Sequence, residues 1–121
     1  GNLEHLTIPK GVEVYEINGP YFFGAGNKFE EVMAVFGDRP VVRVIRMRKV
    51  PFVDSTGIHN LKNLCIMSRK EGIEVVLSGV NSNVRAVLER SGFNELIGKE
   101  NICDHISTAL KRSKEIIGEN A

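Results

Sequence analysis

The sequence feature that most constrains the fold is an apolar run at residues 41–47, followed closely by a segment with helical spacing. The run contains Val41, Val42, Val44, Ile45 and Met47, and nearly continuous apolar strands are typical of parallel sheets covered on both faces. After a short polar stretch, apolar residues return three and four positions apart between residues 58 and 68, as on one face of a helix. A buried strand that leads into an amphipathic helix predicts an α/β fold with a parallel sheet.

Other segments of the chain repeat this alternation. Strands are predicted at residues 12–17 and 74–78, with a short strand at 21–23 and an edge strand or turn at 93–97. Helices are predicted at residues 25–36, from the polar stretch to about residue 71, at 82–91 and at 102–117. The predicted fold is therefore α/β, with a four- or five-stranded sheet that is mostly parallel in its core and about four helices.

Length and charge limit the functions open to the chain. Its 121 residues suffice for one domain, and a formal net charge of +1 provides no global field to attract nucleic acid or anionic lipid. The longest stretch without Asp, Glu, Lys or Arg, residues 17–27, has eleven residues and is too short to cross a bilayer. Cys65 and Cys103 lie outside metal-binding spacings and are expected to be reduced, buried thiols. The chain starts at Gly1 with no Met before it, which suggests a piece of a longer protein.

The most informative polar stretch is the tetrad Asp54-Ser55-Thr56-Gly57, between the apolar run and the helix that follows. A helix start leaves backbone N–H groups unpaired, and Asp54 or Ser55 is suited to accept from them as an N-cap. One interpretation is plain capping. The other is an exposed hydroxyl at the positive end of a helix, a place that favours phosphate or another anion. The residue types alone leave both interpretations open.

No cofactor or metal site is predicted. Gly24 and Gly26 begin like a dinucleotide-binding loop, but Phe29 stands where the third glycine of G-x-G-x-x-G is required. The three histidines are scattered along the chain without metal-ligand spacing: His5, His59 and His105.

No catalytic or nucleic-acid site is predicted either. A triad of Ser55, His59 and Asp54 is rejected because His59 is expected to point outward from its helix, away from the hydroxyl. The one concentration of basic residues is typical of a solvated strand end, and the absence of interleaved aromatic residues argues against nucleic-acid binding. It consists of Arg43, Arg46, Arg48 and Lys49.

Residues 52–58, Phe-Val-Asp-Ser-Thr-Gly-Ile, resemble the signature of STAS domains, the fold shared by sulfate transporters and anti-sigma factor antagonists. The flanks resemble the STAS domain behind the membrane part of SulP-type anion permeases. These flanks are residues 8–15, the Gly-Pro-Tyr-Phe-Phe-Gly segment at 19–24, and Arg46-Met47-Arg48. The resemblance covers residues 8–117 and leaves residues 1–7 and 118–121 as flexible ends.

The resemblance implies a cytoplasmic regulatory or interaction domain that catalyses no reaction and carries no cofactor. Its implied partners are the membrane domain of the same transporter and a regulatory protein, anion or nucleotide, at the cytoplasmic side of the bacterial inner membrane. In the antagonists a partner kinase phosphorylates the hydroxyl before the motif glycine, which is Thr56 here. The implied site residues are Asp54, Ser55, Thr56 and Gly57. The alternative is a free-standing phospho-switch of the anti-sigma factor antagonist type.

Overall fold

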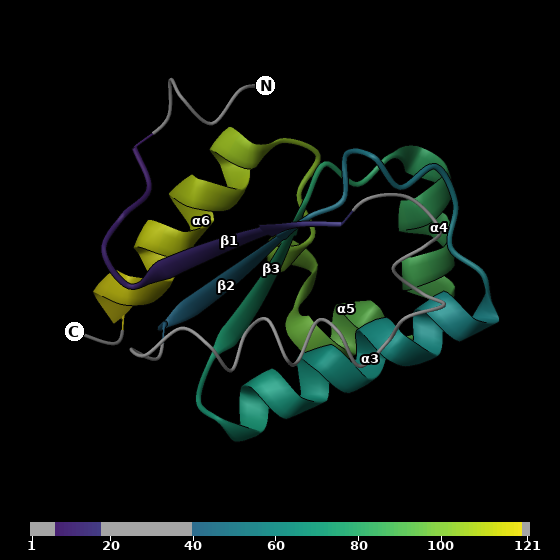
Figure 1. Cartoon of the computed structure of the whole chain (residues 1–121), viewed down its shortest axis with the longest axis horizontal. Coiled ribbons are helices and arrows are strands. Elements are labelled where there is room, and N and C mark those ends of the chain that lie inside the picture. Colours follow the sequence, from purple (N-terminus) through teal and green to yellow (C-terminus); the bar gives the residue numbers. More distant parts are fainter. Residues whose placement is uncertain (1–6, 18–39, 120–121) are drawn as a thin grey trace.

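The computed structural model describes residues 7–17 and 40–119 (Figure 1). Three strands lie in these ranges: β1 (Val12–Glu16), β2 (Val42–Arg46) and β3 (Glu74–Ser78). The helices of the described part are α3 (Ser55–Lys70), α4 (Ser82–Arg90), α5 (Phe93–Ile97), a 3-10 turn η2 (Lys99–Asn101) and α6 (Ile106–Glu119). The strand predicted at 21–23 and the helix predicted at 25–36 lie outside the described residues.

The sheet is parallel, with β2 in the middle of the order β1-β2-β3. Val44 is the partner of Val14 on one side and of Val76 on the other. Ile102 adds a single parallel bridge to Leu77. The predicted α/β fold with a parallel sheet is confirmed, and three of the expected strands form within the described residues.

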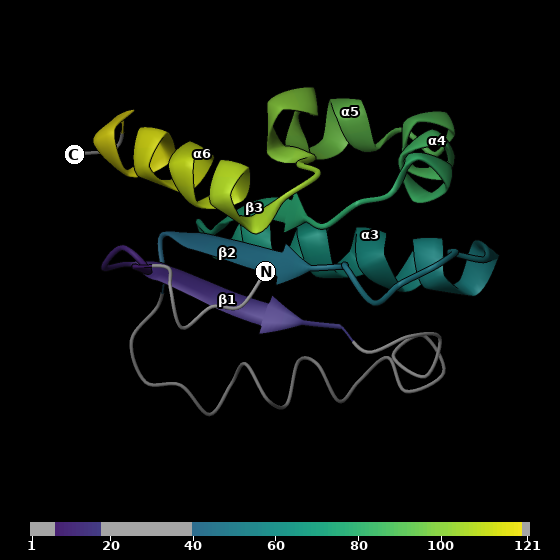
Figure 2. The same ribbon diagram turned by 90° about the horizontal axis from the view of Figure 1, so that it is seen from above.

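Each face of the sheet is covered by helices because the strands alternate two sets of apolar side chains. Val42, Val44 and Val76 pack against α6 on one face. Ile45, Val75 and Leu77 pack on the other face, in a cluster that includes side chains of α3, α4 and α5. Figures 1 and 2 show α6 on one side of the sheet and α3 on the other. Burial on both faces explains why the β2 sequence is almost continuously apolar.

The basic run is not the solvated strand end that the sequence predicts, because Arg43 and Arg46 are buried, at 6% and 3% exposure. The Nε of Arg43 lies 3.0 Å from a carboxylate oxygen of Glu13, and its Nη1 donates to Ser68 Oγ at 2.7 Å. These bonds join β1, β2 and α3, and a buried charge requires such partners. Only the end of the run, at Arg48 and Lys49, is exposed.

Two further predictions are wrong in the C-terminal part. Residues 93–97 form α5 and not an edge strand: Gly92, at φ +85°, turns the chain, and Phe93 and Ile97 are both buried. Their spacing of four places both side chains on one face of a short helix. The last helix begins at Ile106 rather than at residue 102, because Ile102 pairs with β3. This helix runs on to Glu119 and so includes Gly118.

Candidate functional site

The tetrad lies at the carboxyl end of β2, where α3 begins. Asp54 is the N-cap, with extended backbone angles of φ −90° and ψ −179°. Its Oδ1 accepts from the backbone N–H of Gly57 at 2.8 Å, and its carbonyl oxygen accepts from the N–H of Ile58 at 2.9 Å. The predicted cap is confirmed. Ligand sites of open α/β sheets lie at such carboxyl ends.

The polar side chains of the tetrad are exposed, whereas its glycine is buried. Asp54, Ser55 and Thr56 are open to solvent at the positive end of the α3 dipole. Phe52, two residues before the cap, is 58% exposed. The site can therefore present hydroxyls, a carboxylate and an aromatic ring to a partner.

The candidate bases and nucleophiles besides the tetrad hydroxyls include a histidine of α3 and two cysteines. His59 is exposed on α3, and its Nε2 lies 3.2 Å from Nδ2 of Asn63, one turn further along the helix. Both cysteines are free and buried. Burial raises the pKa of the Cys65 thiol to about 12 and also raises the pKa of Cys103, so neither is a thiolate at neutral pH. Among the described residues no group of three His, Cys, Asp or Glu side chains could hold a metal ion.

A second strand-to-helix loop, residues 79–81 between β3 and α4, lies beside the loop that carries the tetrad. Asn81 caps α4, since its Oδ1 accepts from the N–H of Val84 at 2.8 Å. Its Nδ2 donates to the carbonyl oxygens of Val50 and Pro51, both at 3.3 Å. The sequence predicts the cap but not this link, because the linked residues lie 31 and 30 positions apart.

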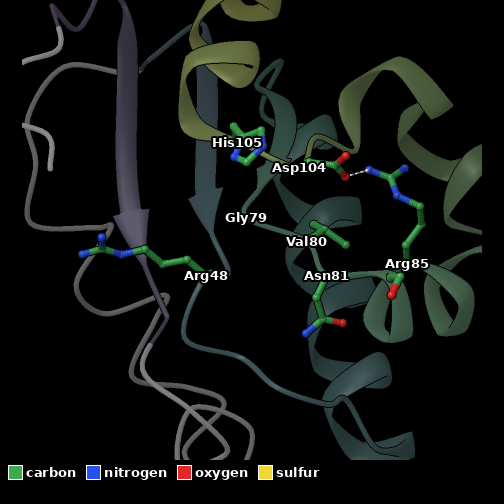
Figure 3. Close-up of a pocket in the computed structure, with 8 residues that line it drawn as sticks. Arg48, Gly79, Val80, Asn81, Arg85, Asp104 and His105 are labelled. Carbon is green, nitrogen blue, oxygen red and sulfur yellow. Dashed lines mark hydrogen bonds and ion pairs between the residues drawn. The ribbon is translucent and has the colours of Figure 1, made fainter. Parts of the chain in front are cut away.

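A pocket of about 580 Å³ opens next to this second loop (Figure 3). Arg85 closes one side, where its Nη2 donates to Asp104 Oδ1 at 2.7 Å and to the carbonyl oxygen of Ile102 at 2.9 Å. Figure 3 shows this pair on one side, with the guanidinium of Arg48 directed away. The lining residues are Arg48, Gly79, Val80, Asn81, Ser82, Arg85, Asp104 and His105. No local pattern predicts this pocket, because three separate segments form it.

The parallel sheet, with helices on both faces and capped helix starts at its carboxyl edge, defines a three-layer α/β domain with its polar loops at one edge. The model of the STAS domain family matches residues 5–109. The chain belongs to the STAS domain family. Within the described ranges, no helix is both long enough and apolar enough to span a membrane.

The solved structures that the chain resembles include STAS domains of transporters. A sulfate transporter family protein from Wolinella succinogenes has 39% identity and a TM-score of 0.87, over 97% of this chain and 96% of that one. The SulP transporter STAS domain from Vibrio cholerae has 35% identity and a TM-score of 0.83, over 93% and 88%. A "putative anti-sigma factor antagonist" from Thermotoga maritima has 17% identity and a TM-score of 0.67, over 93% and 99%, and so shares the fold alone. The chain thus matches transporter STAS domains better than this antagonist.

Curated relatives are much longer than this chain. It is 26% identical over 95 residues to "Putative sulfate transporter YvdB" of Bacillus subtilis (strain 168). That match covers 78% of this chain but 18% of the relative. The chain therefore corresponds to less than a fifth of that protein.

Proposed function

We propose that this chain is the cytoplasmic regulatory domain of a SulP-type anion permease and catalyses no reaction itself. The observation that carries the proposal is the 39% identity to the Wolinella succinogenes sulfate transporter family protein over nearly the full length of both chains. The 18% coverage of the Bacillus subtilis relative fits a domain attached to a larger membrane protein. The transported substrate is proposed to be a sulfate-like anion, and the location the cytoplasmic side of the bacterial inner membrane.

The domain acts through contacts at the loop between β2 and α3. Asp54, Ser55, Thr56 and Gly57 form the proposed regulatory site, with Phe52 exposed beside them. The main partner is the membrane domain of the same transporter, and a regulatory protein, anion or nucleotide modulates that contact. Thr56 is the proposed site of phosphorylation, since its hydroxyl is exposed at the helix start, where a phosphate is well tolerated.

The test uses the protein encoded by the parent gene, reconstituted in lipid vesicles. We expect it to contain apolar spans of about 20 residues and to take up labelled sulfate. Deletion of residues 8–117 should change the uptake rate severalfold, while the membrane domain alone still inserts. A parent gene without such spans, or uptake unaltered by the deletion, would contradict the proposal.

The second candidate function is a free-standing phospho-switch of the antagonist type. It is favoured by one observation, the exposed hydroxyl of Thr56 next to a helix cap. A purified partner kinase that modifies Thr56 in a parent protein of this length would favour this candidate. The parent gene distinguishes the two candidates, because only the permease requires membrane spans.

A further inference from the structure

The outward side of α3 carries basic side chains that no carboxylate neutralises. None of the 16 residues of the helix is Asp or Glu, and the first acidic residue after its start is the C-cap, Glu71. Its basic residues are Lys62, Arg69 and Lys70, and no carboxylate of the described ranges forms an ion pair with them. Arg69 donates to the carbonyl oxygen of Leu96, which leaves its charge unpaired. The helix is therefore a local positive surface on a chain of net charge +1.

Two apolar side chains are exposed among these cations. Ile66 is 39% exposed and Met67 is 40% exposed. Lys62 precedes Ile66 by four residues and Lys70 follows it by four, so the three side chains share one face of the helix. Exposed apolar side chains between lysines are typical of helices that lie on a lipid surface. The lysine stems lie along apolar surface there, and their charged ends reach the headgroups.

The helix α6, on the opposite face of the sheet (Figure 2), lacks this combination. Lys111 and Lys114 are exposed on α6, but the acidic Glu115 is exposed next to them. Among the described residues, none of the large apolar side chains that are exposed lies on α6. Of the two helices that cover the sheet, α3 is thus the one that joins unpaired cations to exposed apolar groups.

We propose that the outward side of α3 docks on an anionic lipid bilayer. The inference rests on the proposed function, because attachment to a membrane domain would hold this chain close to lipid headgroups. One Lys or Arg near an anionic bilayer strengthens binding about fivefold. Three such cations give a weak contact, which is sufficient once the domain is tethered to the membrane. The tetrad begins the same helix, so the bilayer contact and the contact with the membrane domain would be adjacent.

The test is sedimentation of the chain with vesicles. One set contains equal parts of phosphatidylglycerol and phosphatidylcholine, and the other contains phosphatidylcholine alone. At low ionic strength the chain should sediment with the anionic vesicles and stay in solution with the neutral ones. Salt at about 1 M should release it, because the Debye length then falls to about 3 Å. The vesicles test the surface of α3, whereas the parent gene tests the proposed function, so the two can fail separately.

Two double variants assign the binding to one face of the molecule. Lys62→Gln combined with Lys70→Gln should weaken binding to the anionic vesicles about 25-fold, at about fivefold for each cation. Lys111→Gln combined with Lys114→Gln removes the same charge from α6 and should weaken binding less than about threefold, since those cations lie across the sheet and are largely screened. Each variant should keep the wild-type Tm, because none of these side chains is buried.

A third variant separates lipid from any other acidic surface. Ile66→Ser leaves the charge unchanged and should weaken binding severalfold, because it removes apolar area that enters the bilayer interface. Soluble polyglutamate, which offers carboxylates but no apolar phase, should bind the chain more weakly than the anionic vesicles do.

Several results would overturn the proposal. One is a chain that binds neither set of vesicles at low ionic strength, or that binds both sets equally. Another is an equal loss of affinity in the α3 and α6 double variants, or a wild-type affinity in Ile66→Ser. Binding to polyglutamate as tight as to the vesicles would assign this surface of α3 to an acidic protein instead.

Discussion

The loops that follow β2 and β3 both end in a residue that caps the next helix. The two capping side chains differ in the other hydrogen bonds that they make. Asp54 and Asn81 each accept a backbone N–H three residues later at 2.8 Å. Asn81 also donates through its amide to the neighbouring loop. No such second bond is found for the Asp54 carboxylate in the described part of the chain. A single capping geometry thus serves a structural link in one loop and an exposed polar surface in the other.

The backbones of the two loops differ as well. Gly79 has φ +68°, and a Cβ placed there would lie 2.7 Å from the backbone nitrogen of Arg48. No residue of the tetrad has a positive φ. The close approach of Gly79 to Arg48 holds the start of the loop after β2 against the loop after β3. Further along the loop after β2, the side chains of Val50 and Val53 are buried. The contacts of Gly79 and Asn81 therefore hold the first part of the loop after β2, and the side chains of Asp54, Ser55 and Thr56 beyond it remain exposed to a partner.

Among substitutions in the two loops, the largest effect should come from Gly79→Ala. The new methyl group forces both a strained φ and a collision with backbone atoms of Arg48, so the free energy of unfolding should fall by about 3 kcal/mol. Thermal unfolding should show a Tm lower by roughly 10 °C. Gly72→Ala is the matched control, since Gly72 has φ +80° but no atom within 4 Å of the added Cβ. Its cost should be about 1 kcal/mol. Equal losses in the two variants would refute the structural role of the close approach.

The swap of the two capping residues tests the comparison directly. Asn81→Asp keeps the cap but sets a carboxylate against the carbonyl oxygens of Val50 and Pro51, so we expect a loss of about 1–2 kcal/mol. Asp54→Asn should change stability by less than about 0.5 kcal/mol, because Asp and Asn are equally good N-caps. Urea unfolding of both variants measures the difference. If the two substitutions cost the same, Asn81 does not link the loops.

Local patterns predicted the parts of the fold that depend on neighbouring residues. The strands around Val44 and Val76 and the cap at Asp54 follow from period, β-branching and short polar side chains. The helix α5 was missed because its five residues are too few to show a helical period. The burial of Arg43 could not be predicted, since its partners Glu13 and Ser68 lie 30 and 25 positions away.

Separation along the chain also explains which features of the site the sequence does not predict. The position and exposure of the tetrad follow from one continuous segment, so the sequence was sufficient. The pocket and the second bond of Asn81 join segments that meet only after the sheet has formed. Arg85 and Asp104, 19 positions apart, carry no local signal.

A smaller loss of stability is expected when the ion pair at the start of the loop after β2 is removed. The hydrogen bond from Arg48 lowers the pKa of Glu16 below its ordinary value, so this ion pair between the end of β1 and the start of the loop stabilises the fold while Glu16 is ionised. A lowered carboxyl pKa contributes stability above the unfolded-state pKa, and the contribution is lost as the pH falls through the folded-state pKa. Glu16→Gln should therefore cost less than about 1 kcal/mol at pH 7 and nothing in strong acid. A difference between the two proteins that stays constant down to pH 2 would contradict this role.

A small effect on stability, together with the sharpest test of the contact loop, is expected from Thr56→Glu. The new carboxylate lies in the first turn of α3, near the positive end of the helix dipole, so stability should change by less than about 1 kcal/mol in either direction. Leu61→Asp is the opposite case on the same helix. Leu61 is 0% exposed, and an unpaired buried charge costs several kcal/mol, so this variant should not fold.

If the parent protein is the permease proposed above, uptake of labelled sulfate by that full-length protein separates contact from capping. Thr56→Glu should alter the uptake rate although the isolated domain melts near the wild-type Tm, and Thr56→Gln, equal in size but uncharged, should alter it less. Thr56 is exposed and Asp54 already caps the helix, so the added charge changes the surface offered to a partner and not the cap. If Thr56→Glu leaves both uptake and Tm at wild-type values, the tetrad is only a helix cap. The two loops would then differ in their hydrogen bonds and not in function.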